Sequence, residues 1–461
     1  MSAAPQRAKS APSTRWQAAR TELRALWHLS WPILVGQLAN VGMSVVDVAM
    51  AGHVSAQDLA GISLGVSVWN IVIITLMGVL MSVNPTVAHH VGAQELHAIP
   101  RVVRQALWKG LLLGVLAGAI LQSSALIFDA MDLEPYTREV ARGFVQICSF
   151  GLPAFACYRV LYGYSASINQ TKPMMVVALA ALLLNVLINW LLVFGHGGFA
   201  PQGGLGCAWS TLLCVWFNLG GLLLWIRLSP AHRATYPLAR FEWPHWATVR
   251  TLLYLGLPIG MTYFAETSAF ALIALLVARF GSTQIAAHQI ALNFASLVFM
   301  VPLSLSVGVL TRVGQSLGAG LSFAVVSALC IGLFDRQIAQ FYTQDPQVIA
   351  AAVPLLFLAA VFQLSDAAQV VLSGAIRGYK VTRPPMALHL TAFWGFSLPL
   401  GYVLGIAPDW APWRPEQPMQ ATGFWLALVL GLTIAGMGLT WMLRVIAQQH
   451  CAQDLAPSAP R

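Results

Sequence analysis

A long series of apolar runs, each about as long as a membrane is thick, is the strongest constraint on how this chain folds. A bilayer core needs about 20 apolar residues per spanning helix, and the sequence offers twelve such runs. The first six cover residues 26–52, 58–88, 106–128, 141–168, 173–195 and 204–227. The other six cover residues 252–280, 284–311, 321–341, 348–376, 385–406 and 422–446. We therefore predict an all-α membrane protein with twelve transmembrane helices.

The distribution of charged residues supports this count. Only 9% of the residues are charged, against about 25% in soluble domains. With the N-terminus inside, 19 of the 25 Lys and Arg residues lie on the inner side, as the positive-inside rule requires. Nine of the 16 acidic residues lie outside. A missed helix would invert every later loop and destroy this separation, so we expect both termini to be cytoplasmic.

The composition also excludes some functions. The net charge of +9 follows from the topology, and no basic patch with interleaved aromatic residues indicates binding to nucleic acid. The sequence has no phosphate-binding GxxxxGK[ST] motif, so we do not expect the chain to use ATP directly. We expect no cofactor other than a coupling ion.

The two sets of six runs resemble each other, which indicates an internal repeat. Equivalent positions are Pro32 and Pro258, and Gly92 and Gly318, both 226 residues apart, and Thr171 and Thr382, 211 residues apart. The falling offset means that the second half is shorter near Gly320, before the ninth run. Each half has an even number of helices, so both halves enter from the same side of the membrane. We therefore predict two six-helix bundles, an N lobe and a C lobe, related by a pseudo-two-fold axis along the membrane normal.

These predictions divide the chain into five parts. A cytoplasmic tail covers residues 1–25, the N lobe 26–228, a cytoplasmic linker 229–251, the C lobe 252–447 and a second cytoplasmic tail 448–461. The cleft between the lobes is the natural path for a substrate, and we expect the chain to act as a monomer.

Three acidic residues, Asp47, Glu266 and Asp366, fall well inside predicted helices. Each costs at least about 2.5 kcal/mol at that depth, so we expect a function for them. With a rise of 1.5 Å per residue, Glu266 and Asp366 reach similar depths and can face one cavity. We interpret the three carboxylates as groups that bind H+ or Na+ and compete for a cationic substrate, with Glu266 and Asp366 as candidate Na+ ligands. The alternative is structural pairing, in which Arg159 or a backbone amide satisfies one acid.

Other polar and aromatic residues extend this hypothesis. Asn185 and Asn189 lie four residues apart on one helix face and offer amide oxygens to a hard cation. The alternative is that they form hydrogen bonds between helices. Pro32 predicts a bend in the first helix, which makes this helix the candidate moving part. Aromatic residues that can stack on flat organic cations, or simply pack, are Tyr158, Tyr162, Trp190, Tyr263, Phe264 and Phe294.

Several of these segments resemble the multidrug and toxic compound extrusion (MATE) family, in its bacterial NorM-like branch, from about Leu26 to Ile446. The segments that carry the resemblance are Pro32 with Val46 to Gly52, Leu257 to Glu266, Ala286 to Ala291, and Asp366 to Lys380. The resemblance implies that Asp47, Glu266 and Asp366 take part in cation coupling. It further implies bending at Pro32 and polar ligands at Asn185 and Asn189.

The resemblance also implies a function, which is that of a transporter and not an enzyme. It predicts a V-shaped secondary active multidrug efflux transporter of the bacterial inner membrane. Such a protein exports cationic or amphiphilic organic compounds in exchange for Na+ or H+ by alternating access. One alternative is a lipid-linked precursor flippase of the same superfamily, which would favour a cationic cavity. Another is an integral-membrane lipid-modifying transferase, which would show catalytic clusters at a membrane face and large loops. Buried acids and short loops argue against both.

Overall fold

Apolar sequence and helix-forming residues give a chain that is helical almost throughout. The structure is a computed structural model and describes residues 15–129, 134–308, 313–411 and 414–455. The first half contains α1 (Arg15–Val54), α2 (Ala56–Leu80), α3 (Val83–Gly92), α4 (Ile99–Ser124), α5 (Pro135–Ser149), α6 (Leu152–Ser167), α7 (Lys172–Leu192) and α8 (Gly204–Leu228). The second half contains α9 (Trp246–Val277), α10 (Ser282–Gly308), α11 (Val313–Tyr342), α12 (Pro346–Gly378), α13 (Arg383–Leu390), α14 (Leu398–Ile406) and α15 (Gln420–Leu455).

Eleven helices of the described residues are long and apolar enough to cross a membrane, and a bent pair brings the number to 12. The pair consists of α5 and α6, which meet at an angle of 50°. Pro153 in the first turn of α6 helps to start a new helix here, because proline cannot donate the hydrogen bond that would continue α5. The prediction of an all-α protein with twelve spans is confirmed.

The helix boundaries differ from the predicted ones in several places. The helix α1 begins at Arg15, within the tail predicted for residues 1–25, and continues through Pro32. The helix α11 begins at Val313, before the predicted start at residue 321. The predicted span 385–406 consists of α13, a π-helical segment at Thr391–Ser397 and α14.

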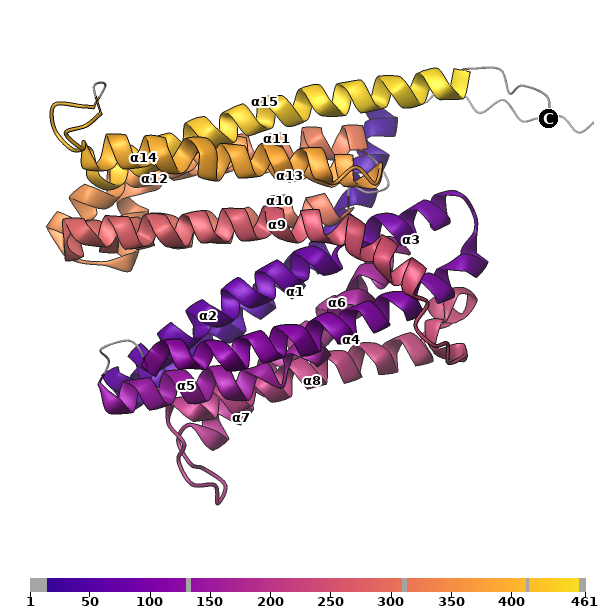
Figure 1. Cartoon of the computed structure of the whole chain (residues 1–461), viewed down its shortest axis with the longest axis horizontal. Helices are drawn as coiled ribbons and strands as arrows, with labels where there is room; N and C mark the ends of the chain where they lie inside the picture. The colour runs from indigo at the N-terminus through magenta and orange to yellow at the C-terminus, as the bar shows by residue number, and fades with distance from the viewer. Residues whose placement is uncertain (1–14, 130–133, 309–312, 412–413, 456–461) are drawn as a thin grey trace, which may run out of the picture.

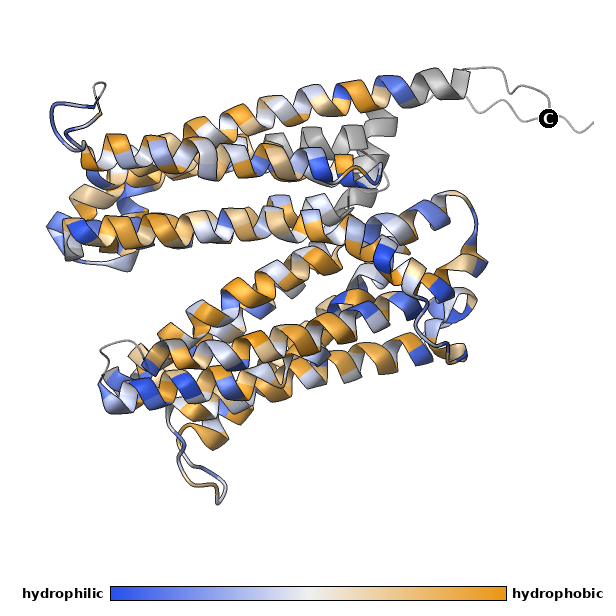
Figure 2. Cartoon of the chain, in the orientation of Figure 1, coloured by the Kyte–Doolittle hydropathy of each residue, from blue (hydrophilic) through white to orange (hydrophobic). Residues whose placement is uncertain are grey.

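The helices form two bundles with separate cores. Within the first bundle α1 packs on α7, α2 on α5 and α4 on α6, while in the second α12 packs on α10, α11 and α15. Figure 1 shows the two bundles side by side, diverging away from the end at which α3 lies. Hydrophobic residues run along the helices, whereas hydrophilic ones gather at helix ends and connecting segments (Figure 2). This arrangement suits a protein surrounded by lipid along its helices.

A close contact between α2 and α9 joins the two bundles. A Cβ atom on Gly256 would overlap the carbonyl oxygen of Val79, and one on Gly260 would overlap the Val79 side chain. A Cβ atom on Gly78 would lie 2.8 Å from the Cα atom of Gly260. The absence of side chains at these glycines therefore permits the two backbones to approach this closely. We call this contact between α2 and α9 the seam.

Lys109 stabilises the seam from the α4 side. Its side chain is buried, and its Nζ atom donates to the carbonyl oxygen of Val79 at 3.2 Å and to Ser82 Oγ at 2.7 Å. The chain leaves α2 here, so the ammonium group satisfies an acceptor at a helix end. Lys109 lies near the start of the apolar run predicted for residues 106–128. A lysine near the end of an apolar run satisfies the positive-inside rule whether it lies in the loop or turns inward.

The segment between α8 and α9 is attached to the first bundle. Arg104 Nη2 lies 2.6 Å from Glu242 Oε1, and Trp108 Nε1 donates to the carbonyl oxygen of Glu242 at 2.9 Å. The hydrogen bond from Arg104 holds the pKa of the Glu242 carboxyl below its usual value. Tyr164 adds a buried hydrogen bond to Thr235. The connection between the bundles therefore follows the first bundle up to the start of α9.

We predict that Gly256→Ala lowers the melting temperature of the detergent-solubilised protein. The added methyl group overlaps the Val79 carbonyl, and overpacking of this kind costs about 1–3 kcal/mol. Gly220→Ala is the matched control, because a Cβ atom on Gly220 in α8 meets nothing within 4 Å. Alanine there should leave the melting temperature unchanged or raise it. Equal melting curves for the two variants would contradict the proposed role of the seam.

Candidate functional site

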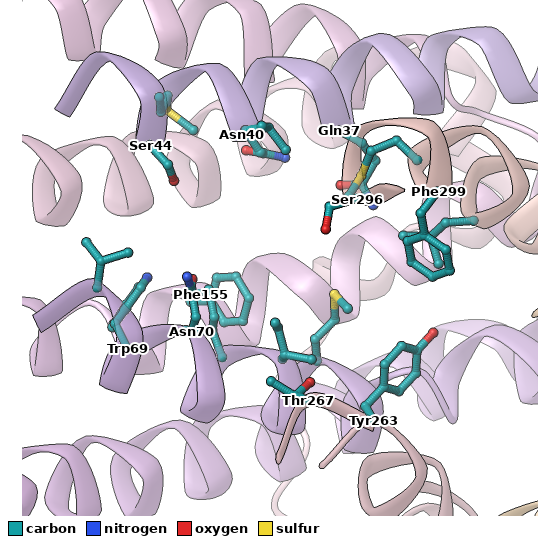
Figure 3. A pocket seen from close by; sticks show the side chains of 18 of the residues that line it. Gln37, Asn40, Ser44, Trp69, Asn70, Phe155, Tyr263, Thr267, Ser296 and Phe299 are labelled. Atoms are coloured by element: carbon teal, nitrogen blue, oxygen red, sulfur yellow. The ribbon is translucent and has the colours of Figure 1, made fainter. Parts of the chain in front are cut away.

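A cavity of about 630 Å³ lies between the two bundles. Helices α1, α2, α5, α6, α7 and α8 line it from the first bundle, and α9, α10, α12 and α15 from the second. All three acids predicted from the sequence, Asp47, Glu266 and Asp366, line this cavity. Figure 3 shows Gln37, Asn40 and Ser44 on one wall, facing Asn70 and Thr267 across the cavity. The site is thus an apolar cavity with isolated polar groups from both lobes.

Asp47 lies on α1 and is held by three donors. Its Oδ1 atom accepts hydrogen bonds from Asn185 Nδ2 at 2.9 Å and Asn189 Nδ2 at 2.6 Å. Its Oδ2 atom accepts one from Thr211 Oγ1 at 3.0 Å. Hydrogen bonds to a charged group are stronger than those to a neutral one, and they favour the ionised carboxylate. The structure therefore brings together Asp47, Asn185 and Asn189.

The two asparagines use their amide NH2 groups for Asp47, so their oxygens point elsewhere. The Oδ1 atoms of Asn185 and Asn189 are buried and have no hydrogen-bond partner among the described residues. Buried oxygens without a donor are uncommon, and they are the kind of ligand that a hard cation takes. The cluster thus has a carboxylate with donors and two amide oxygens still available.

In the alternative of structural pairing, Arg159 satisfies one of the buried acids. Among the described residues, Arg159 instead contacts an aromatic ring. Its guanidinium lies over the ring of Tyr162, 4.6 Å from the ring centroid. Asp47 is satisfied instead by amide and hydroxyl groups. Arg159 lines the cavity and contributes a positive charge to its wall.

The two acids of the second bundle have a different environment. Asp366 on α12 is 2% exposed, and its Oδ1 atom has no hydrogen-bond partner in the part of the chain that the structure describes. Glu266 on α9 lies close enough to act electrostatically on Asp366, and Arg377 in turn acts on Glu266. Two neighbouring carboxylates in a poorly solvated site repel each other unless one binds a cation or a proton. This pair is therefore suited to taking up a positive charge.

The aromatic residues of the cavity were predicted only in part. Tyr158 and Tyr263 line it, whereas Tyr162, Trp190, Phe264 and Phe294 do not belong to its lining. Trp190 stacks on His196, with 4.3 Å between the ring centroids. Further aromatic residues on the walls are Trp69, Phe144, Phe155, Phe270, Phe299, Phe362 and Trp425.

Three polar residues of α1 were missed, although the sequence contains a signal for them. Gln37, Asn40 and Ser44 precede Asp47 by ten, seven and three residues. This spacing places all four on one face of a helix. The same reasoning applies to polar residues within other apolar runs, such as Asn70 and Ser296, which also line the cavity.

Pro32 is buried within α1, one and a half turns before Gln37. Because proline has no N–H, the carbonyl of His28, four residues earlier, receives no helical hydrogen bond from it. Such a position can bend at lower cost than the rest of the helix. The helix α1 is continuous here, so bending at Pro32 stays a prediction.

The geometry of this site can be compared with known proteins. A family model described as MatE matches residues 32–191 and 258–403. The chain is 40% identical over 459 residues to "Multidrug resistance protein PmpM" of Pseudomonas aeruginosa, covering 96% of this chain and 95% of that protein. It is 40% identical over 450 residues to "Probable multidrug resistance protein NorM" of Chromobacterium violaceum, covering 94% and 96%.

A solved structure is also similar. The one described as "Crystal structure of MATE in the bent conformation" has a TM-score of 0.82 and 16% identity, covering 96% of this chain and 99% of that one. At 16% identity, the likeness to this solved structure shows a shared fold alone. The match to the family model extends over most of both bundles, and the two relatives match almost from end to end. The chain therefore belongs to the MatE family.

Proposed function

We propose that this chain is a secondary active transporter that exports cationic or amphiphilic organic compounds in exchange for Na+ or H+. The observation that carries the proposal is a cavity of about 630 Å³ that three carboxylates from both bundles line. Its volume lies within the range of about 300–1,000 Å³ that drug-sized ligands occupy. Aromatic walls suit flat organic cations. The printed names of the two relatives, both multidrug resistance proteins, support the same function.

The proposed cycle uses competition for the carboxylates. With both termini in the cytoplasm of a bacterial inner-membrane protein, the seam lies on the cytoplasmic side and the cavity faces outward. An incoming H+ or Na+ neutralises the carboxylates, which weakens the hold on a cationic substrate and releases it outside. The lobes, 26–228 and 252–447, then move relative to each other as a monomer, with Pro32 as the bending point in α1.

The two acidic sites have different proposed roles. Glu266 and Asp366 bind the coupling ion, as a shared proton site or as Na+ ligands, because they carry neighbouring and incompletely satisfied charges. Asp47, with Asn185 and Asn189, forms the second site. A lipid-linked precursor flippase would need cations to hold phosphate groups. The cavity presents three acids against Arg159, which favours a cationic substrate.

Transport in vesicles tests the function. We expect vesicles that contain the purified chain to expel a fluorescent organic cation when an inward gradient of either Na+ or H+ is imposed separately. Protein-free vesicles are the control for passive leakage. If folded protein gives no efflux under either gradient, antiport is the wrong function and the flippase and transferase alternatives gain weight.

We predict that Glu266→Gln and Asp366→Asn each abolish gradient-driven efflux while leaving expression unchanged. Each variant removes a carboxylate that must bind and then release the coupling ion. The amide that replaces it has nearly the same volume, so packing is unchanged. Glu416→Gln is the matched control, because Glu416 lies exposed in the segment before α15 and should transport like wild type. Full activity in both variants would rule out the proposed ion site.

We predict that Asn189→Ala changes the ion dependence of efflux in a direction that identifies the ion. The 2.6 Å hydrogen bond from Asn189 stabilises the charged Asp47 by about 1.5–3 kcal/mol. If the ion is H+, its loss favours protonation, so half-maximal transport moves to higher pH. If the ion is Na+ and Asn189 is a ligand, more Na+ is needed. Asn293→Ala is the control, since Asn293 is exposed on α10 and lies outside the cavity lining. An unchanged ion dependence would exclude Asn189 from the site.

A further inference from the structure

A second, smaller cavity borders Glu266. It measures about 20 Å³ and lies among α9, α10, α12 and the start of α13, where Thr382 and Pro385 line it. Glu266 and Tyr263 belong to the lining of both cavities. A space of this size holds one water molecule, which needs at least about 10–15 Å³. Glu266 is therefore positioned between the substrate cavity and a space for a single water.

Two buried side chains of α12 make this small cavity polar. Gln369 is 2% exposed and Ser373 is 4% exposed, and both line the cavity. Gln369 Oε1 and Ser373 Oγ have no hydrogen-bond partner among the described residues. Buried polar atoms without a partner cost about 1–3 kcal/mol each, and buried waters commonly satisfy such atoms. The two atoms thus indicate an ordered water in this cavity.

His389 on α13 lines the same cavity in a defined tautomer. Its Nδ1 atom lies 2.6 Å from the carbonyl oxygen of Pro385. A carbonyl oxygen only accepts hydrogen bonds, so Nδ1 carries the hydrogen. The other ring nitrogen, Nε2, is then an acceptor when the ring is neutral. His389 is buried, and it therefore offers a proton acceptor within the protein.

Arg377 supplies a permanent positive charge to the same place. Its Nε atom donates to the carbonyl oxygen of Ser373 at 3.0 Å, and its guanidinium acts electrostatically on both Glu266 and His389. The titratable or charged groups around the cavity are Glu266 and Tyr263 on α9, Arg377 on α12 and His389 on α13, with Asp366 nearby on α12. The positive charge of Arg377 stabilises the Glu266 carboxylate once a cation has left it. The same charge repels a cation that is still bound at Glu266.

We propose that the small cavity is the release site through which a proton leaves Glu266, by way of one water and His389, on the side of the seam. The proposal rests on the proposed antiport and deepens it by naming the ion. The O–H bond of the Glu266 carboxyl breaks and its proton goes to the water oxygen, while one O–H bond of the water breaks and its proton goes to His389 Nε2. The neutral ring is restored, with the same tautomer, when the Nε2 proton passes to a water that enters from the side of the seam. Glu266 remains as a carboxylate facing Arg377.

The size of the cavity is the reason for naming H+ as the ion. A cavity needs about 10–15 Å³ to hold one water, so 20 Å³ has room for one water and not for a Na+ ion with a shell of several waters. A proton needs only hydrogen-bonded acceptors. The proposed route is therefore selective for H+ by its dimensions.

Two assays on the full chain in vesicles test the route. One measures efflux of a fluorescent organic cation driven by a pH gradient, and the other measures exchange of labelled for unlabelled cation without a gradient. Exchange needs no release of the ion, because the transporter returns loaded with substrate. We expect His389→Gln to lower driven efflux by at least about tenfold, as expected for loss of a proton acceptor, and to leave exchange unchanged.

Two further variants complete the test. His232→Gln is the matched control, because His232 is another buried histidine, lies beside Ser165 and lines neither cavity. It should leave both assays unchanged. Ser373→Val fills the cavity and removes the unpartnered hydroxyl, so it should reproduce the effect of His389→Gln. Ser373→Val decides the matter if His389→Gln fails to fold.

The outcomes separate this proposal from the proposed function. Wild-type efflux driven by Na+ and not by pH would overturn the release route and leave antiport standing. Equal loss of efflux and exchange in His389→Gln and Ser373→Val would show a structural role only, and no loss in either assay would also overturn the route. Wild-type protein that neither exchanges nor expels the cation would reject antiport itself.

Discussion

The close contact between α2 and α9 fixes where the other functional parts of the molecule lie. Because Gly256 and Gly260 lack side chains, the two bundles touch at one end of these helices and diverge from there (Figure 1). Glu266 follows Gly260 by six residues, about 9 Å along α9. It therefore lies just beyond the seam, where both the substrate cavity and the smaller cavity reach it. The close approach of the α2 and α9 backbones at the seam thus places Glu266 where it borders both cavities.

The buried carboxylates of the two bundles have opposite environments. Three donors satisfy Asp47, so its negative charge is stabilised locally even without a bound ion. Asp366 keeps an oxygen without a partner and has Glu266 beside it, so its negative charge is poorly compensated. A cation or proton consequently gains more by entering the second site. The pseudo-symmetry of the two halves therefore does not extend to their electrostatics.

Hydropathy and charge were enough to predict the spans and the three acids, because apolar length and the rarity of buried acids are properties of single segments. The hydrogen-bond partners of the buried polar side chains were not predictable in the same way. An asparagine amide can donate or accept, so the sequence did not reveal that Asn185 and Asn189 use their NH2 groups for Asp47. The inward turn of Lys109 and the π-helical segment before α14 also depend on packing between helices. The small cavity joins Glu266, Gln369 and His389, which are far apart in sequence and share no local pattern.

Arg377 connects the proposed ion site to the contact between the bundles. Its Nη1 atom lies 3.9 Å from the sulfur of Met81, the residue that follows α2, and its guanidinium is 5.8 Å from the ring centroid of Tyr263 on α9. The same guanidinium acts on Glu266. When Glu266 is neutral, the attraction that holds Arg377 towards the second bundle is lost, and the energy of its contact with the first bundle changes accordingly. Binding of an ion at Glu266 and the stability of the seam are therefore physically coupled through one side chain, because both depend on where its charge rests.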